Sequence, residues 1–272
     1  IVCGRVSFVL GLQGACAAYD SACSSGLVAT HAALSALTLN ECASGLAIGI
    51  NLMLLPALCL GCATAGMTSA LGRCHTFDGR ADGYARSEAC SAHTLQQGSD
   101  GALQASLELC GGAVRQDGKS ASLTAPNGQA QQALRLAVRA RAGNFTHRSR
   151  FVEAHGTGTA LGDPIEAGSH AAVASTLGEG VDALGSVKAN LGHSEPGAGS
   201  SGLLMLTLQL GQSQATANAQ LRVLNPRVRT ALGEYISVLH VQGEAAFDSA
   251  SGSVSSFGYG GTIAHLAVVR SS

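Results

Sequence analysis

The sequence predicts an α/β fold whose helices and strands pack through small side chains. Apolar segments typical of buried strands alternate with helix-forming segments along the 272 residues, as in layered α/β domains. Hydrophobic residues make up 46% of the chain and charged residues only 12%, so much of it must be buried. Aromatic residues are 4%, tryptophan is absent and glycine occurs 36 times, which favours close approach of the elements.

The first part of the chain is predicted to run from helix to strand to helix. We expect a helix end in residues 1–20, a turn near residues 11–14 and a short strand ending at Asp20. A helix follows from Cys23 to about Leu39, a segment rich in Ala and Leu without Pro. Residues 47–54 read as a central strand, and residues 72–86 as a surface or rim loop.

Residues 43–72 form the longest uncharged stretch and are a membrane-span candidate by length alone. Asn51 and Pro56 interrupt this stretch, as do several Gly, Ser and Thr residues. A fully buried strand followed by a loop and a helix fits it better. We therefore expect no membrane span.

From residue 126 onward, predicted helices and strands alternate more clearly than in the first part. Helices are expected at residues 126–142, capped by Asn127, at 164–177 and at 200–209. Strands are expected at residues 151–154 and 183–187, and a closing hairpin at 254–259 and 262–269.

Three Gly-rich segments carry reactive side chains: residues 20–27, 152–159 and 188–195. They supply Cys23, His155 and His193, and a thiol nucleophile with two imidazoles can perform acyl transfer. For any one of them alone, a buried structural cysteine or a core histidine is an alternative. Cys23 sits where a helix begins, and the helix dipole should lower the pKa of its thiol.

These segments, together with residues 72–84, 123–128 and 255–262, resemble the β-ketoacyl synthase domain of polyketide and fatty-acid synthases. The resemblance implies a thiolase-like fold of two similar halves, layered α-β-α-β-α. Residues 1–122 would be the remainder of the N-terminal half, carrying the nucleophile, and residues 123–272 the C-terminal half, carrying both histidines. The family has a substantial stretch upstream of the cysteine, so we expect an incomplete first half: a fragment, a divergent relative or one piece of a split domain.

The resemblance also implies roles for individual residues. Cys23 would carry the acyl chain, and the two histidines would polarise the thioester carbonyl of the extender. The other implied assignments are a supporting pair, Lys188 and Glu195; pantetheine contacts, Thr157 and Thr159; and an oxyanion and gating loop, Tyr259, Gly260 and Gly261. Tyr259 stands where Phe is more usual in the family, and Ile263 stands where Asn is usual. The resemblance therefore does not predict the hydrogen bonds of this loop.

Composition also bears on nucleic-acid binding, the redox compartment and metal sites. The formal net charge is −1 without a dense Lys or Arg run, which argues against nucleic-acid binding. Nine irregularly spaced cysteines read as reduced thiols in an intracellular, reducing compartment, cytoplasmic or plastid. Cys59 and Cys62 lack a second pair at zinc spacing, so we read them as buried small residues and expect no metal site. His31, His75, His147, His170 and His265 are expected to be structural or exposed.

The leading interpretation is a condensing enzyme. Its substrates would be carried on the phosphopantetheine of an acyl carrier protein or on CoA, without a tightly bound cofactor. Expected partners are the acyl carrier protein, the missing N-terminal portion or another protein, and a homodimer or larger assembly. A thiolase is disfavoured, because thiolases pair one histidine with a second reactive cysteine. A non-catalytic subunit with an assembly role stays open, since residues 87–111 are unusually polar.

Overall fold

The computed structural model describes residues 1–98, 107–143, 150–178, 182–235, 237–240, 245–246 and 250–271. The helices are α1 (Val2–Leu10), α2 (Ser25–Thr38), α3 (Pro56–Thr64), α4 (Gly128–Arg141), α5 (Gly162–Thr176), α6 (Lys188–Leu191), α7 (Ala198–Gln212) and α8 (Pro226–Leu232), with 3-10 turns η1 (Ala22–Ser24) and η2 (Glu195–Gly197). The strands are β1 (Ser44–Asn51), β2 (Ala89–Gln96), β3 (Leu107–Gln116), β4 (Arg150–Glu153), β5 (Asp182–Gly185), β6 (Gln214–Ala215), β7 (Ser237–Val238), β8 (Ala245–Ala246), β9 (Ser251–Phe257) and β10 (Thr262–Arg270).

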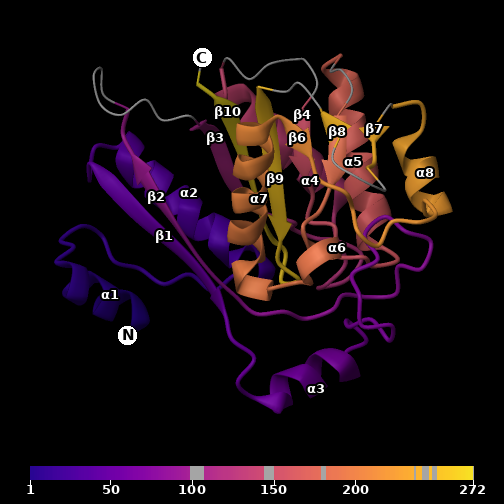
Figure 1. The fold of residues 1–272 in the computed structure, drawn as a ribbon, viewed down its shortest axis with the longest axis horizontal. Helices are drawn as coiled ribbons and strands as arrows, with labels where there is room; N and C mark the ends of the chain where they lie inside the picture. Colours follow the sequence, from indigo (N-terminus) through magenta and orange to yellow (C-terminus); the bar gives the residue numbers. More distant parts are fainter. Residues whose placement is uncertain are drawn as a thin grey trace.

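These elements form alternating layers of sheet and helix (Figure 1). α2 and α7 lie between the two-stranded sheet of β1 and β2 and a six-stranded sheet. α4 covers the opposite face of the six-stranded sheet and packs against α5, which in turn packs against α8. The predicted α/β class is confirmed.

The six-stranded sheet has the order β3-β10-β9-β4-β5-β7. β4 pairs in parallel with both β9 and β5, whereas β10 is antiparallel to both β3 and β9. β3 therefore belongs to the sheet of the second half, although it precedes the division expected at residue 122. We propose that the two halves divide before β3, in residues 97–106.

The main core lies between α7 and the six-stranded sheet. Leu206 and Leu210 of α7 are fully buried, together with Phe151 of β4 and Leu266 of β10. These side chains recur at helical spacing on α7 and on the inward face of each strand, so one apolar layer holds the histidine-bearing turns in place.

The second half matches its sequence pattern closely. The Asn127 side chain accepts hydrogen bonds from the N–H groups of Gln129 and Ala130 and caps α4, as predicted. The helices predicted at 164–177 and 200–209, the strands at 151–154 and 183–187 and the closing hairpin are all present, with ends that differ by a few residues.

The first half differs from its predictions in three places. The strand predicted to end at Asp20 is wrong, because residues 12–20 pair with no strand in the described part of the chain. β1 is not central, since it pairs only with β2 among the described strands. α3 forms as predicted but buries none of its residues, and Leu58 and Leu60 are exposed on it.

α3 also carries the Cys59-x-x-Cys62 motif. Both cysteines are half-buried, so the expectation that they are buried small residues is wrong. All nine cysteines of the chain are free. In the described residues, no helix has the length and apolarity needed to cross a membrane.

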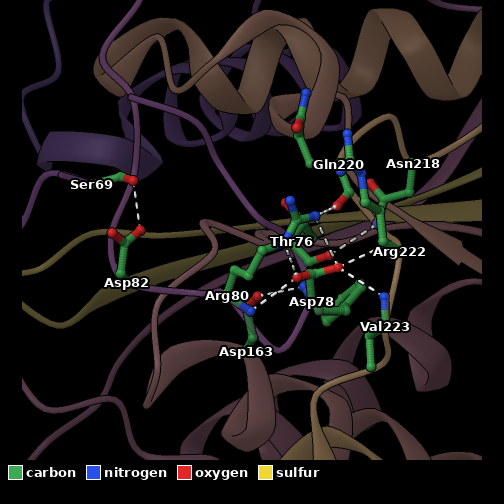
Figure 2. A network of polar contacts seen from close by, with 11 residues as sticks. Ser69, Thr76, Asp78, Arg80, Asp82, Asp163, Asn218, Gln220, Arg222 and Val223 are labelled. Atoms are coloured by element: carbon green, nitrogen blue, oxygen red, sulfur yellow. Dashed lines mark hydrogen bonds and ion pairs between the residues drawn. The ribbon is translucent and has the colours of Figure 1, made fainter. Parts of the chain in front are cut away.

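The segment 72–86 is not a rim loop, because its central residues are buried. Phe77 packs in the core beside α5, and Asp78 is fully covered. The Asp78 carboxylate accepts hydrogen bonds from Arg80 and from the backbone N–H groups of Arg222 and Val223 (Figure 2). A charged residue can be buried when every oxygen finds a donor, a pairing that the sequence does not reveal.

Candidate active site

Cys23 lies in the 3-10 turn η1 that leads directly into α2. Ala22, immediately before it, has a left-handed backbone with φ 53°, which is unusual for a residue other than glycine. Hydroxyl groups hold this turn: Ser25 Oγ donates to the carbonyl of Ala22 at 2.6 Å, and Ser256 Oγ donates to the carbonyl of Cys23 at 2.6 Å. The strained turn thus presents the thiol toward the second half.

The thiol of Cys23 is protonated at neutral pH in this structure. Burial is the largest influence and raises its pKa to about 12, although the nearby charge of Lys188 and the backbone N–H groups of Cys23 and Tyr259 act in the opposite direction. The expectation of a lowered pKa is therefore wrong for the unliganded site. Loss of water around the sulfur outweighs the helix terminus.

His193 contacts Cys23 directly. Its Nε2 atom lies 3.1 Å from Cys23 Sγ, and its Nδ1 atom accepts the backbone N–H of Glu195 at 3.1 Å. A neutral imidazole has one acceptor and one donor nitrogen. Because Nδ1 is the acceptor, Nε2 carries the hydrogen and donates toward the sulfur.

His155 has the same arrangement. Its Nδ1 atom accepts the backbone N–H of Phe257 at 3.3 Å, which leaves Nε2 as the N–H of the neutral ring. The rings of His155 and His193 have centroids 5.6 Å apart. Two imidazole rings from separate turns therefore lie side by side, and that of His193 contacts the Cys23 thiol.

The turn that carries His155 is held by a buried carboxylate. Glu166 of α5 accepts the backbone N–H of His155 at 2.8 Å and of Gly156 at 2.9 Å. Gly156 has a φ of 44°, and a Cβ atom there would lie 2.7 Å from Cβ of Ser186. Glycine is required here by both conformation and space.

Both histidines are uncharged under ordinary conditions. Burial lowers the pKa of His155 and of His193 well below its usual value, and the positive charge of Lys188 acts in the same direction on both. The two rings are therefore suited to donate hydrogen bonds to a developing negative charge, and not to hold a permanent positive charge.

The two residues expected to support the site, Lys188 and Glu195, have different surroundings. Lys188 is buried, not part of a surface ion pair, and its charge acts on Cys23, on both histidines and on buried Glu153. Glu195 pairs with Arg86 through two contacts of 2.7 Å. No ion pair joins Lys188 to Glu195, both of which lie in the described part of the chain.

The glycine-bracketed loop lies over the thiol. Tyr259 as a whole is 57% exposed, while its backbone N–H faces the Cys23 thiol. The turn is closed by a hydrogen bond from Gly261 N–H to the Gly258 carbonyl at 2.9 Å, and Gln116 holds the Gly260 carbonyl at 3.0 Å. The Gln116 side chain thus hydrogen-bonds to the loop. Ile263, which follows the loop, is buried in the core.

The two threonines lie beyond His155. Thr157 is buried, and its Oγ1 atom lies 3.3 Å from Oγ1 of Thr159. Thr159 Oγ1 accepts the N–H of Gly162 at 3.1 Å and so helps to begin α5. This contact gives Thr159 a structural role in addition to any contact with a substrate arm.

Several residues near the site were missed by the sequence interpretation. Tyr84 packs edge-on against His193 with ring centroids 4.8 Å apart, and Arg86 forms the ion pair with Glu195. Both belong to the segment 72–86, which the sequence predicts to be a rim loop. Glu166 and Ser256 were also missed, because their partners are backbone groups that no residue pattern reveals.

The other histidines in the described part of the chain are not part of this cluster. His75, His170 and His265 are buried, and His31 is partly covered. His170 Nε2 lies 2.8 Å from Asp182, and His265 Nδ1 lies 2.9 Å from Ser255. His147 falls outside the described residues. Over the described ranges, no three His, Cys, Asp or Glu side chains are grouped as metal ligands.

Two family models match the chain. Residues 1–101 match the β-ketoacyl synthase N-terminal domain, and residues 107–222 match the β-ketoacyl synthase C-terminal domain. The chain belongs to the β-ketoacyl synthase family. The gap between the two matches coincides with the division that we propose before β3.

Curated relatives of this ketosynthase are much longer proteins. One of the phenolphthiocerol/phthiocerol polyketide synthase proteins of Mycobacterium tuberculosis is 39% identical over 277 residues, which cover 98% of this chain and 15% of that protein. The phenolphthiocerol synthesis polyketide synthase type I Pks15/1 of Mycobacterium bovis is 41% identical over 276 residues, covering 98% and 13%.

Solved ketosynthase structures share the fold. The ketosynthase from module 6 of the Bacillus subtilis bacillaene synthase has a TM-score of 0.90 and 29% identity, over 99% of this chain and 50% of that one. The oxazolomycin ketosynthase domain OzmH KS7 of Streptomyces albus has a TM-score of 0.92 and 30% identity, over 100% and 49%. The fold is thiolase-like, as predicted, and the chain spans about half the length of these structures.

Proposed function

We propose that this ketosynthase catalyses decarboxylative Claisen condensation of an acyl thioester with a malonyl-type extender. The observation that carries the proposal is the set of hydrogen-bond donors around Cys23. His193 Nε2–H lies 3.1 Å from the sulfur, and the backbone N–H groups of Cys23 and Tyr259 face it. Four groups with separate positions in the sequence, His155 included, converge on one reacting centre.

In the first step, the Cys23 sulfur attacks the acyl thioester and the carrier thiol leaves. The backbone N–H groups of Cys23 and Tyr259 stabilise the oxyanion that forms on the acyl carbonyl. His193 is a donor toward the sulfur and not its base, because its Nδ1 lone pair is occupied. The charge of Lys188 favours the thiolate, and the proton lost by the Cys23 thiol is taken up by the departing carrier thiolate.

In the second step, the malonyl-type extender loses CO₂. The electron pair of the broken C–C bond becomes the enolate of the remaining acetyl thioester, and Nε2–H of His155 and His193 hydrogen-bonds its oxygen. The enolate carbon attacks the acyl–Cys23 carbonyl, and the Cys23 thiolate leaves. The product is a β-ketoacyl thioester two carbons longer.

The substrate arm is proposed to be the phosphopantetheine of an acyl carrier protein, or CoA, with Thr157 and Thr159 as contacts. The names of the curated relatives identify them as polyketide synthases, which supports the polyketide pathway over fatty-acid synthesis. A panel of acyl and extender thioesters in the assay below would define the substrate range.

The test is a single-turnover assay of the intact protein. Radiolabelled acyl–carrier should label Cys23, and malonyl–carrier should then release CO₂ and give the extended product. The matched control is Cys23→Ala, which should lose the label. A folded protein that is neither labelled nor releases CO₂ would support the non-catalytic assembly role, which the many exposed apolar side chains of the first half favour.

A further inference from the structure

The segment 84–87 lies beside His193 and is bonded to it on both sides. His193 N–H donates to the Ala85 carbonyl at 2.7 Å, and Ser87 N–H donates to the His193 carbonyl at 2.9 Å. Asn51, at the end of β1, donates from Nδ2 to the Ser87 carbonyl at 2.7 Å. The backbone of His193 is therefore fixed by a segment that begins more than a hundred residues earlier.

Arg86, within this segment, reaches the residue that sets the His193 tautomer. Its Nε atom lies 2.7 Å from Glu195 Oε1, and its Nη2 atom lies 2.7 Å from Oε2. The two side chains are only 8% and 16% exposed. A two-point fork of this kind fixes the direction of the carboxylate as well as its distance.

Glu195 has a backbone conformation that needs support. Its φ is 44°, in the left-handed region that favours glycine, and it precedes Pro196, which disfavours the right-handed helical region. In this conformation its N–H lies 3.1 Å from His193 Nδ1. Because the N–H and the side chain belong to the same residue, holding the Glu195 carboxylate also restricts the position of this N–H.

We propose that Arg86 is a positioning residue for His193. By holding the Glu195 side chain, Arg86 keeps the Glu195 backbone N–H on Nδ1, so that the hydrogen of the imidazole stays on Nε2 and faces Cys23. The inference rests on the proposed function for its catalytic consequence, but the tautomer it describes is a property of the resting protein. Arg86 does not itself touch the reacting atoms.

The direct test is ¹⁵N NMR of the His193 ring in the intact protein labelled at histidine. The wild type should show a hydrogen-bearing Nε2 and a lone pair on Nδ1. Arg86→Gln should populate the opposite tautomer or exchange between the two. An unchanged Nε2–H tautomer in a folded Arg86→Gln protein would overturn the proposal.

Arg80→Gln is the matched control. Arg80 lies in the same segment and also forms a two-point ion pair, with Asp78 at 2.7 and 3.2 Å (Figure 2). Asp78 keeps three backbone N–H donors without it. The Arg80→Gln variant should have lower stability but the same His193 tautomer as the wild type. If Arg80→Gln changed the tautomer as much as Arg86→Gln, the loss of any ion pair in this segment would have the same effect, and the specific role of Arg86 would be overturned.

Turnover gives a second, separate readout. Arg86→Gln should lower CO₂ release at least about tenfold while leaving a measurable acyl–Cys23 adduct, since a displaced donor affects the charged transition state most. Arg86→Lys, which keeps the charge, should restore part of the rate. If the wild type itself releases no CO₂, the proposed function fails, yet the NMR comparison still decides the positioning role. If Arg86→Gln does not fold, the near-isosteric Glu195→Gln carries the same comparison.

Discussion

His193 Nε2 lies 3.1 Å from Cys23 Sγ, although 170 positions separate the two residues in the chain. The contact joins the two halves of the fold. Cys23 lies in η1, which leads into α2 beside β1, and His193 follows α6, after β5 of the six-stranded sheet. Because the lone pair of the histidine is occupied at Nδ1, the ring acts here as a donor. This geometry leads to separate predictions for thiol and imidazole.

The raised pKa of Cys23 predicts slow alkylation at neutral pH. With a pKa of about 12, the thiolate fraction rises about tenfold for each pH unit between pH 7 and 9. The iodoacetamide reaction rate at Cys23, measured by peptide mapping, should follow that slope, with exposed Cys90 of the same molecule as reference for the reagent. A rate that is already maximal at pH 7 would contradict the prediction.

His155→Ala and His193→Ala should separate decarboxylation from acyl loading. Losing one donor to an oxyanion costs about 2.7–4 kcal/mol, or roughly 10²–10³ in rate. CO₂ release should therefore fall at least that far in either variant, while a labelled acyl–Cys23 adduct is still detected. His31→Ala, on α2 away from the cluster, is the control; equal CO₂ release from all the variants would make the paired histidines structural.

Gly258→Ala should displace the loop that covers Cys23. A Cβ atom at this position would collide with the carbonyl oxygen of Ser21 and approach Ser24 Oγ to 3.2 Å. The Tyr259 N–H would then leave the sulfur, and acyl loading should fall about a hundredfold, the effect of one lost oxyanion donor. Gly260→Ala has open space for its Cβ and should cost much less. A similar loss of acyl loading in both variants would show that the position of the Tyr259 N–H is not what determines loading.

Buried Glu153 should make stability depend on pH. Burial is the main reason that its pKa rises to about 8 in the folded protein, from a usual 4.5. The folded state therefore holds a proton that the unfolded chain releases, so the contribution of Glu153 to the free energy of unfolding should fall as pH rises between about 4.5 and 8. The lowered pKa values of His155 and His193 act in the opposite direction below pH 6.5, so the measurement is the difference between wild type and Glu153→Gln in urea titrations, and this difference should become less favourable to the wild type as pH rises. Exposed Glu41→Gln should show no such change with pH.

The chain by itself should self-associate or require a partner. Phe8, Leu54, Leu58 and Leu60 are among the large apolar side chains exposed in the first half, more than a monomer usually shows. Light scattering after size-exclusion chromatography should give a mass above 27.2 kDa or a broad distribution. The double substitution of Leu58 and Leu60 by Glu should shift the distribution towards the monomer. A monodisperse wild-type monomer would contradict this expectation.

Local pattern was sufficient for most elements of the second half. The cap at Asn127 and the apolar spacing of α7 depend on residues close in sequence, so helix positions could be predicted within a few residues. The strand predicted before Cys23 is absent because strand formation does not depend on local pattern alone. A strand needs a neighbour to accept its hydrogen bonds, and residues 12–20 have none among the described strands.

Cys23, His155 and His193 could be named as candidates from the sequence, because their three segments resemble motifs of the β-ketoacyl synthase family. Their protonation states and the hydrogen bonds that orient them depend on the tertiary structure and could not be predicted from the sequence. The thiol pKa depends on how much water the fold removes, and the imidazole tautomers depend on the N–H groups of Phe257 and Glu195. Arg86 and Glu166 act through contacts across the fold, and such contacts leave no periodic or local mark on a sequence.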